Sequence, residues 1–137
     1  GRTFILPSNE ERKKACGEKF IFDQCHNIKN RHVYIIEDSI VRGTTMKHVI
    51  NKLKEHNPKT INLRITAPPI VSPCHYGIDM AITDELIING KNVDDVRDEL
   101  GVTSLRYIDI EVMEKVFGHQ VCKSCFTGKY DDKLFDW

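Results

Sequence analysis

Residues 32–45, which read HVYIIEDSIVRGTT, decide the fold of this chain. The run from Val33 to Ile36 is apolar and rich in β-branched and aromatic side chains, which is typical of a buried strand. Two carboxylates and a short polar turn follow the run. Beyond the turn, apolar side chains recur at the i, i+3, i+4, i+7 spacing of an amphipathic helix: Met46, Val49, Ile50 and Leu53. The order of strand, acidic pair, turn and helix predicts a ligand-binding edge of an open α/β sheet.

The turn at 39–45 has the chemistry of a phosphate site. A helix N-terminus offers unpaired N–H groups and the positive end of the helix dipole, and both suit an anion. Gly43 lets the backbone approach a ligand, and hydroxyl groups can donate further hydrogen bonds. These hydroxyls belong to Ser39, Thr44 and Thr45.

The two carboxylates, Glu37 and Asp38, do not suit the same phosphate, but they suit sugar hydroxyls or a Mg²⁺ ion, which prefers oxygen ligands. A loop that offers both a phosphate site and a diol site would suit a phosphorylated ribose as its ligand. The alternative is an ordinary strand–turn–helix in which Thr44 caps the helix and the acids face water.

The string EDSIVRGTT at 37–45 resembles the phosphoribosyl-pyrophosphate (PRPP) loop of type I phosphoribosyltransferases, and its SIVRGTT part is similar to that of the glutamine PRPP amidotransferases. The resemblance implies that Glu37 and Asp38 hold the ribose hydroxyls with Mg²⁺. It also implies that the turn holds the 5′-phosphate, chiefly through backbone N–H groups. The turn residues are Ser39, Ile40, Val41, Arg42, Gly43, Thr44 and Thr45. Glu37 is a departure, because these amidotransferases usually carry Asp there.

Composition is that of an ordinary globular protein. Of the 137 residues, 40% are hydrophobic and 29% are charged, and 20 basic residues balance 20 acidic ones. We therefore expect one domain or part of one, no nucleic-acid partner and no membrane association. The chain has five cysteines and no visible signal peptide, so reduced thiols or metal ligands in the cytoplasm are expected rather than disulfides.

The first 20 residues are expected to form a flexible catalytic loop and a helix. GRTFIL at 1–6 reads as a short strand, and Ser8 with Glu11 forms a capping box that predicts a charged helix. GRTFILP followed by a basic run resembles the catalytic loop of the amidotransferases, which closes over PRPP. The resemblance places Arg2 and Lys19 as its pyrophosphate-binding cations.

The middle of the chain predicts a parallel sheet. His56-Asn57-Pro58 ends the first helix, and 60–66 (TINLRIT) alternates as a second strand, so the segment is a βαβ unit. The three prolines of 67–79 predict a rigid extended loop. Asn92 is expected to cap a helix that ends at Gly101, with a third strand at 105–108. Val112, Met113, Val116 and Phe117 predict a last amphipathic helix, which ends at Gly118.

The tail holds Cys122-Lys123-Ser124-Cys125, and a C-x-x-C pair can place two thiolates on one metal ion. A redox couple and two incidental thiols are the alternatives. The strings PPI-x-x-PC-x-YGID and CFTGKY resemble the amidotransferases that carry a 4Fe–4S cluster. The resemblance makes Cys74, Cys122 and Cys125 three cluster ligands, with the fourth upstream of this chain, since Cys16 and Cys25 do not match it.

A Cys₃His zinc site is the chemical alternative to the cluster. It would use the same three cysteines with His75 or His119.

The resemblance extends over nearly the whole chain and implies the C-terminal portion of a type I phosphoribosyltransferase fold, an α/β parallel sheet flanked by helices. We divide it into the loop and helix at 1–20, the core at 21–117 and a cysteine-bearing tail at 118–137. The N-terminal glutaminase domain and the first half of the sheet are absent. We therefore expect a fragment that is inactive alone.

The resemblance implies that the complete enzyme transfers ammonia from glutamine to PRPP, giving phosphoribosylamine and pyrophosphate at the start of purine synthesis. It also implies purine nucleotide inhibitors and a homo-oligomer, either a dimer or a tetramer. The alternatives are a nucleobase phosphoribosyltransferase and a non-catalytic module that senses PRPP or nucleotides. The strings around Cys74 and Cys122 argue against the first, and Arg2 and Lys19 argue against the second.

Overall fold

The structure is a computed structural model, and it describes residues 28–78 and 82–130. The strand expected at 1–6, the helix expected after Ser8 and the side chains of Arg2 and Lys19 lie outside the described residues.

A three-stranded parallel sheet forms the centre of the fold, in the order β1-β2-β3. The strands are β1 (His32–Glu37), β2 (Thr60–Ile65) and β3 (Ser104–Tyr107). In the register, Leu63 of β2 pairs with Ile35 of β1 and with Leu105 of β3. The predicted α/β fold with a parallel sheet is therefore confirmed, and its strand bounds differ from the predicted ones by one residue.

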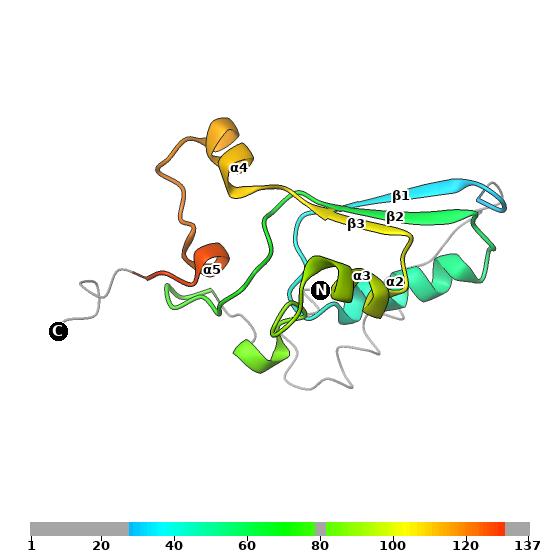
Figure 1. Ribbon diagram of the computed structural model, residues 1–137, viewed down its shortest axis with the longest axis horizontal. Helices are drawn as coiled ribbons and strands as arrows, with labels where there is room; N and C mark the ends of the chain where they lie inside the picture. The colour runs from blue at the N-terminus through cyan, green and yellow to red at the C-terminus, as the bar shows by residue number, and fades with distance from the viewer. Residues whose placement is uncertain (1–27, 79–81, 131–137) are drawn as a thin grey trace.

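The helices occupy two different places around this sheet (Figure 1). The helices α2 (Thr44–Lys54) and α3 (Val93–Leu100) cover one face of the sheet. The helices α4 (Ile110–Phe117) and α5 (Ser124–Thr127) lie beyond the carboxyl ends of the strands. A short 3₁₀ turn, η2 (Thr83–Glu85), precedes α3. Within the described ranges, no helix is long and apolar enough to cross a membrane.

The main core lies between the sheet and its two covering helices. Ile50 of α2, Leu63 of β2 and Val96 of α3 are fully buried, so each of these three elements places one side chain at the centre. Deleting such side chains typically costs about 2–5 kcal/mol. The opposite face of the sheet is less covered within the described residues, where Tyr34 and Ile36 remain 62% and 65% exposed.

Local sequence signals explain where α3 begins and ends. The Asn92 side chain accepts a hydrogen bond from the N–H of Asp95, and the Asp95 carboxylate accepts one from the N–H of Asn92, each at 2.9 Å. This reciprocal capping box satisfies two N–H groups that a helix start would otherwise leave unpaired. Gly101 ends the helix in the left-handed conformation, with φ 66°. Both predicted ends of this helix are confirmed.

Glu99 links three parts of the chain through two ion pairs. Its carboxylate lies 2.6 Å from Nζ of Lys47 on α2 and 2.5 Å from Nζ of Lys91 in the turn before α3. Hydrogen bonds from Lys47 and then Lys91 hold the pKa of Glu99 below its usual value of 4.5. The two ion pairs therefore contribute their full stabilisation at pH values above the Glu99 pKa of the unfolded chain. This contribution is lost as the pH falls through the lower Glu99 pKa of the folded protein.

Glu99→Gln should lower the free energy of unfolding at pH 7 by about 1 kcal/mol or less, because the three side chains are partly exposed. The difference from wild type should shrink as the pH falls below the usual Glu pKa of 4.5 and disappear below the lower pKa of folded Glu99. Urea unfolding of the full-length protein at several pH values measures both. A difference that grew on acidification would contradict this assignment.

Candidate functional site

The predicted phosphate loop runs from the carboxyl end of β1 to the start of α2. Gly43 occupies the N-cap position with φ 75°, and no side chain caps the helix. The first turn of α2 also contains no acidic residue. Thr44 is therefore the first residue of the helix rather than its cap. A helix start with neither a side-chain cap nor a nearby carboxylate is suited to an anion.

Gly43 is required by packing as well as by its backbone conformation. A Cβ atom at this position would lie 2.3 Å from Cδ1 of Ile87, which is far inside van der Waals contact. The positive φ also disfavours any residue with a side chain. From the sequence, we expect Gly43 to let the backbone approach a ligand. The structure adds a second reason for glycine, the closeness of Ile87, which the local sequence pattern did not indicate.

Three of the predicted substrate-binding residues direct their side chains to the protein. Ile40 is buried in the core at 5% exposure. Arg42 donates from Nε to Oε2 of Glu85 at 2.5 Å, and the Val41 side chain packs beside a small cluster around Leu86. These loop residues can therefore contribute to a ligand site through the backbone.

The remaining polar residues of the loop lie at its two ends. Asp38 accepts a hydrogen bond from the Ser39 hydroxyl at 2.9 Å, directly after β1, while Thr44 and Thr45 open α2. Glu37 ends β1, and its backbone carbonyl accepts from the N–H of Thr66 at 2.9 Å. The acids and the helix start thus occupy opposite ends of one loop, as the sequence predicted.

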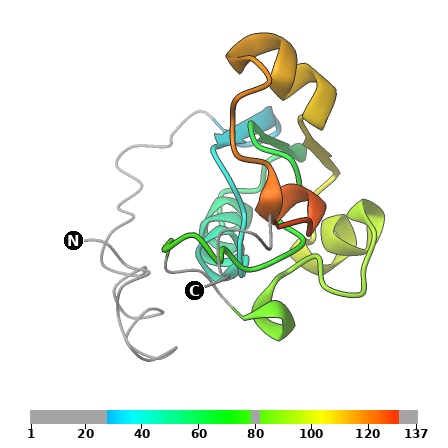
Figure 2. The ribbon, with the colours of Figure 1, turned by 90° about the vertical axis from the view of Figure 1, so that its left-hand side faces the viewer.

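The three predicted cluster cysteines come from two segments that the fold brings together. The carbonyl oxygen of Cys125 in α5 accepts from the N–H groups of Val71 and Ser72, at 2.9 and 3.1 Å. Figure 2, which looks toward the carboxyl ends of the strands, shows α5 beside this extended segment. The sequence did not predict α5. Cys125 lies in this short helix rather than in a plain turn.

All three of these cysteines are free thiols. Burial raises the pKa of Cys125, and the charges of Cys122 and Cys74 raise it further. Within the described residues, however, no three His, Cys, Asp or Glu side chains are already arranged to hold a metal ion.

The two histidines proposed for a zinc site have other partners. His75 stacks on Tyr130 with ring centroids 4.3 Å apart and planes inclined by 15°. The Tyr130 hydroxyl donates to the carbonyl oxygen of Pro73, next to Cys74. The Nδ1 atom of His119 lies 3.6 Å from Oε2 of Glu114. The aromatic stack thus anchors Tyr130 of the tail beside Cys74.

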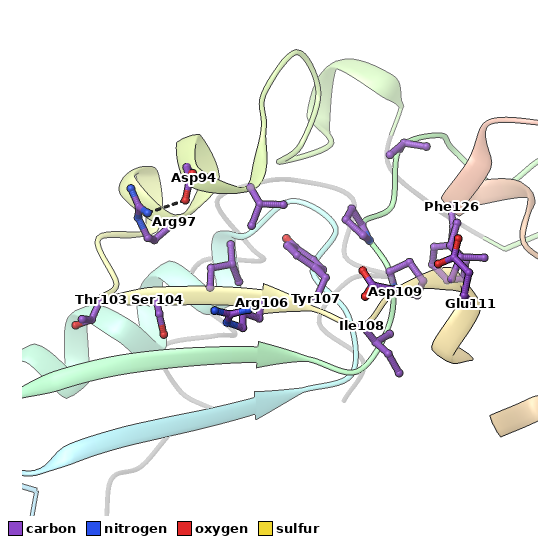
Figure 3. A pocket seen from close by; sticks show the side chains of 16 residues that line it. Asp94, Arg97, Thr103, Ser104, Arg106, Tyr107, Ile108, Asp109, Glu111 and Phe126 are labelled. Carbon is purple, nitrogen blue, oxygen red and sulfur yellow. Dashed lines mark hydrogen bonds and ion pairs between the residues drawn. The ribbon is translucent and has the colours of Figure 1, made fainter. Parts of the chain in front are cut away.

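A separate cavity of about 710 Å³ opens at the carboxyl end of β3 (Figure 3). Tyr107 points from β3 toward α3, and Phe126 of α5 and Glu111 of α4 lie at the far side. Burial raises the pKa of Tyr107 to about 12, so its hydroxyl is protonated at neutral pH. None of the residues 37–45 lines this cavity, so it is distinct from the predicted phosphate loop.

The parallel sheet and the polar loop between β1 and α2 define an α/β protein with a phosphoribosyltransferase-type fold. A solved structure with this fold, titled glutamine PRPP amidotransferase from B. subtilis complexed with ADP and GMP, superimposes with a TM-score of 0.71. It is 34% identical to this chain, and the match covers 95% of this chain and 30% of that one.

Curated relatives are homologous to almost all of this chain. The amidophosphoribosyltransferase of Methanocaldococcus jannaschii is 41% identical over 135 residues, which is 98% of this chain and 28% of that protein. That of Methanothermobacter thermautotrophicus is 40% identical over 137 residues, 98% of this chain and 29% of the relative. No family model matches the chain. The chain therefore corresponds to less than a third of the length of the enzymes it is similar to.

Proposed function

We propose that this chain is part of an amidophosphoribosyltransferase, which transfers ammonia from glutamine to PRPP and releases phosphoribosylamine and pyrophosphate. The observation that carries the proposal is the loop at 37–45, where an acidic pair and an uncapped helix start lie at opposite ends of one turn. The homology of the chain to amidophosphoribosyltransferases supports the same activity.

In this proposal the loop binds PRPP by its phosphate and its ribose. Backbone N–H groups at the start of α2 and the hydroxyls of Ser39, Thr44 and Thr45 hold the 5′-phosphate. Glu37 and Asp38 hold the ribose hydroxyls. None of these residues has to act as a nucleophile, because orientation and charge stabilisation at an electron-poor sugar carbon account for the catalysis. Arg2 and Lys19, outside the described residues, would neutralise the departing pyrophosphate.

Two cofactors belong to the proposal. The carboxylates of Glu37 and Asp38 are the oxygen ligands that Mg²⁺ prefers, and the ion would offset negative charge on the pyrophosphate. Cys74, Cys122 and Cys125 would hold a 4Fe–4S cluster, with a fourth ligand from elsewhere in the protein. Their thiol chemistry fits such a cluster, and the hydrogen bonds from Val71 and Ser72 to the Cys125 carbonyl bring the two cysteine-bearing segments side by side. Zinc is the alternative occupant.

The partners of the complete protein are proposed on the same basis. Purine nucleotides would inhibit by binding at the phosphate loop, and the solved relative is described as a complex with ADP and GMP. We further propose a cytoplasmic homo-oligomer, a dimer or a tetramer, without nucleic-acid or membrane partners.

Asp38→Asn in the full-length protein should lower kcat/KM for PRPP by about a hundredfold, because the amide cannot supply the negative charge that a metal-bound ribose requires. Pyrophosphate release with saturating ammonia and Mg²⁺ measures this. Asp98→Asn is the matched control, since Asp98 is an exposed residue of α3 paired with Arg97, and it should keep full activity. Wild-type protein that binds PRPP without turnover would instead indicate a sensing module.

A further inference from the structure

The segment at 85–87 contacts three successive residues of the phosphate loop. The N–H of Ile87 donates to the carbonyl oxygen of Val41 at 2.8 Å. Glu85 accepts from Nε of Arg42 at 2.5 Å, and the Ile87 side chain fills the space where a Cβ of residue 43 would stand. This segment is therefore the structural support of the loop from outside the loop itself.

The segment at 85–87 contacts the loop and is itself held by a buried apolar cluster. The backbone leaves η2 in the extended conformation at Leu86, with φ −69° and ψ 127°. Glu85 bonds to Arg42 and Ile87 contacts Val41 and Gly43 of the loop. Leu86 is buried in a cluster with Ile70, against which Phe126 and Val41 pack. Because Leu86 is held in that cluster, its two neighbours have a fixed position.

We propose that Glu85 and Ile87 are positioning residues that hold the backbone N–H groups of the 39–45 loop in the geometry that binds the 5′-phosphate of PRPP. The inference rests on the proposed function for its ligand. Arg42 is then an anchor of the loop rather than a phosphate ligand, because its Nε is bonded to Glu85 and both side chains are partly buried, at 23% and 37% exposure. A loop that the fold already holds in its binding geometry loses little conformational entropy when the ligand binds.

The first test uses Glu85→Gln in full-length protein with PRPP, Mg²⁺ and saturating ammonia. The substitution keeps the shape of the side chain and removes its charge. KM for PRPP should rise about fivefold to tenfold while kcat changes less than about twofold, because a weakened charged hydrogen bond loosens binding geometry and not the chemical step. Glu85→Asp, which keeps the charge on a shorter side chain, should lie between Gln and wild type.

Glu55→Gln is the matched control, since Glu55 pairs with Lys52 at the other end of α2. It should leave KM unchanged. A double variant of Arg42→Gln and Glu85→Gln should be no worse than Arg42→Gln alone, as expected if the two residues act as a pair. An unchanged KM in Glu85→Gln would overturn the inference. Tighter PRPP binding would also overturn it, since Glu85 would then be withholding Arg42 from the ligand.

Hydrogen exchange without ligand separates this inference from the proposed function. The amides of 39–45 should exchange about tenfold faster in Glu85→Gln than in wild type, and Glu55→Gln should match wild type there. If wild type does not bind PRPP, the proposed function fails while faster loop exchange would still support the positioning role. If loop exchange is unchanged by Glu85→Gln, the positioning role fails whatever the ligand is.

Discussion

Gly43→Ala should weaken PRPP binding by at least about a hundredfold and destabilise the fold. The left-handed backbone at φ 75° costs about 1–2 kcal/mol with a side chain present. The new Cβ would also stand 2.3 Å from Cδ1 of Ile87, and such overpacking costs about 1–3 kcal/mol. Relief of the clash would move the Ile87 side chain or the start of α2, where the phosphate is proposed to bind. Titration calorimetry with PRPP and urea unfolding measure the two effects.

Two variants separate crowding from backbone strain at Gly43. Gly90 has φ 67° with nothing within 4 Å of an added Cβ, so Gly90→Ala should show the backbone cost alone and leave PRPP binding intact. Adding Ile87→Val to Gly43→Ala removes Cδ1 and should restore part of the lost stability. Identical stability losses at the two glycines would contradict the packing explanation.

Cys122→Ser should abolish binding of the metal cluster in the full-length protein. If the cluster proposal is correct, anaerobically purified wild type contains about four irons and four acid-labile sulfides per chain, and the variant contains neither. A serine hydroxyl is a much poorer ligand for iron than a thiolate, so the loss should be complete. Iron, sulfide and zinc analysis together with visible absorption measures the result.

Cys16→Ser is the matched control, because Cys16 does not fall at a ligand position of the resemblance and its loss should leave the metal content unchanged. One zinc per chain without sulfide would replace the cluster by the zinc alternative. Absence of metal from carefully prepared wild type would leave Cys74, Cys122 and Cys125 as ordinary thiols, and only the loop proposal would stand.

Elements marked by local patterns could be predicted from the sequence. The alternation of 60–66 predicted the second strand, and Asn92 as a cap with Gly101 as the stop predicted both ends of α3. These signals act within a few residues, so the chain itself displays them. The short helix α5 was missed because four residues carry no helical periodicity.

The supporting contacts of the loop could not be predicted in the same way. Glu85 meets Arg42 across 43 positions of the chain, and no local pattern marks a pair at that separation. Glu85 and Ile87 instead looked like ordinary residues between two elements. The resemblance named the loop as a binding site, but only the fold shows that Ile40, Val41 and Arg42 direct their side chains into the protein.

The contacts that Glu85, Leu86 and Ile87 make have a consequence for protein engineering. The loop at 37–45 cannot be transferred by itself, because its conformation depends on the segment at 85–87. That segment packs through Leu86 against Ile70 and Phe126. Grafting only the nine loop residues into another α/β scaffold would transfer their sequence without their conformation. A functional graft would also have to include residues 83–88 and an apolar site in which Leu86 packs. The smallest unit that can be transferred is therefore a pair of segments that lie far apart in the sequence.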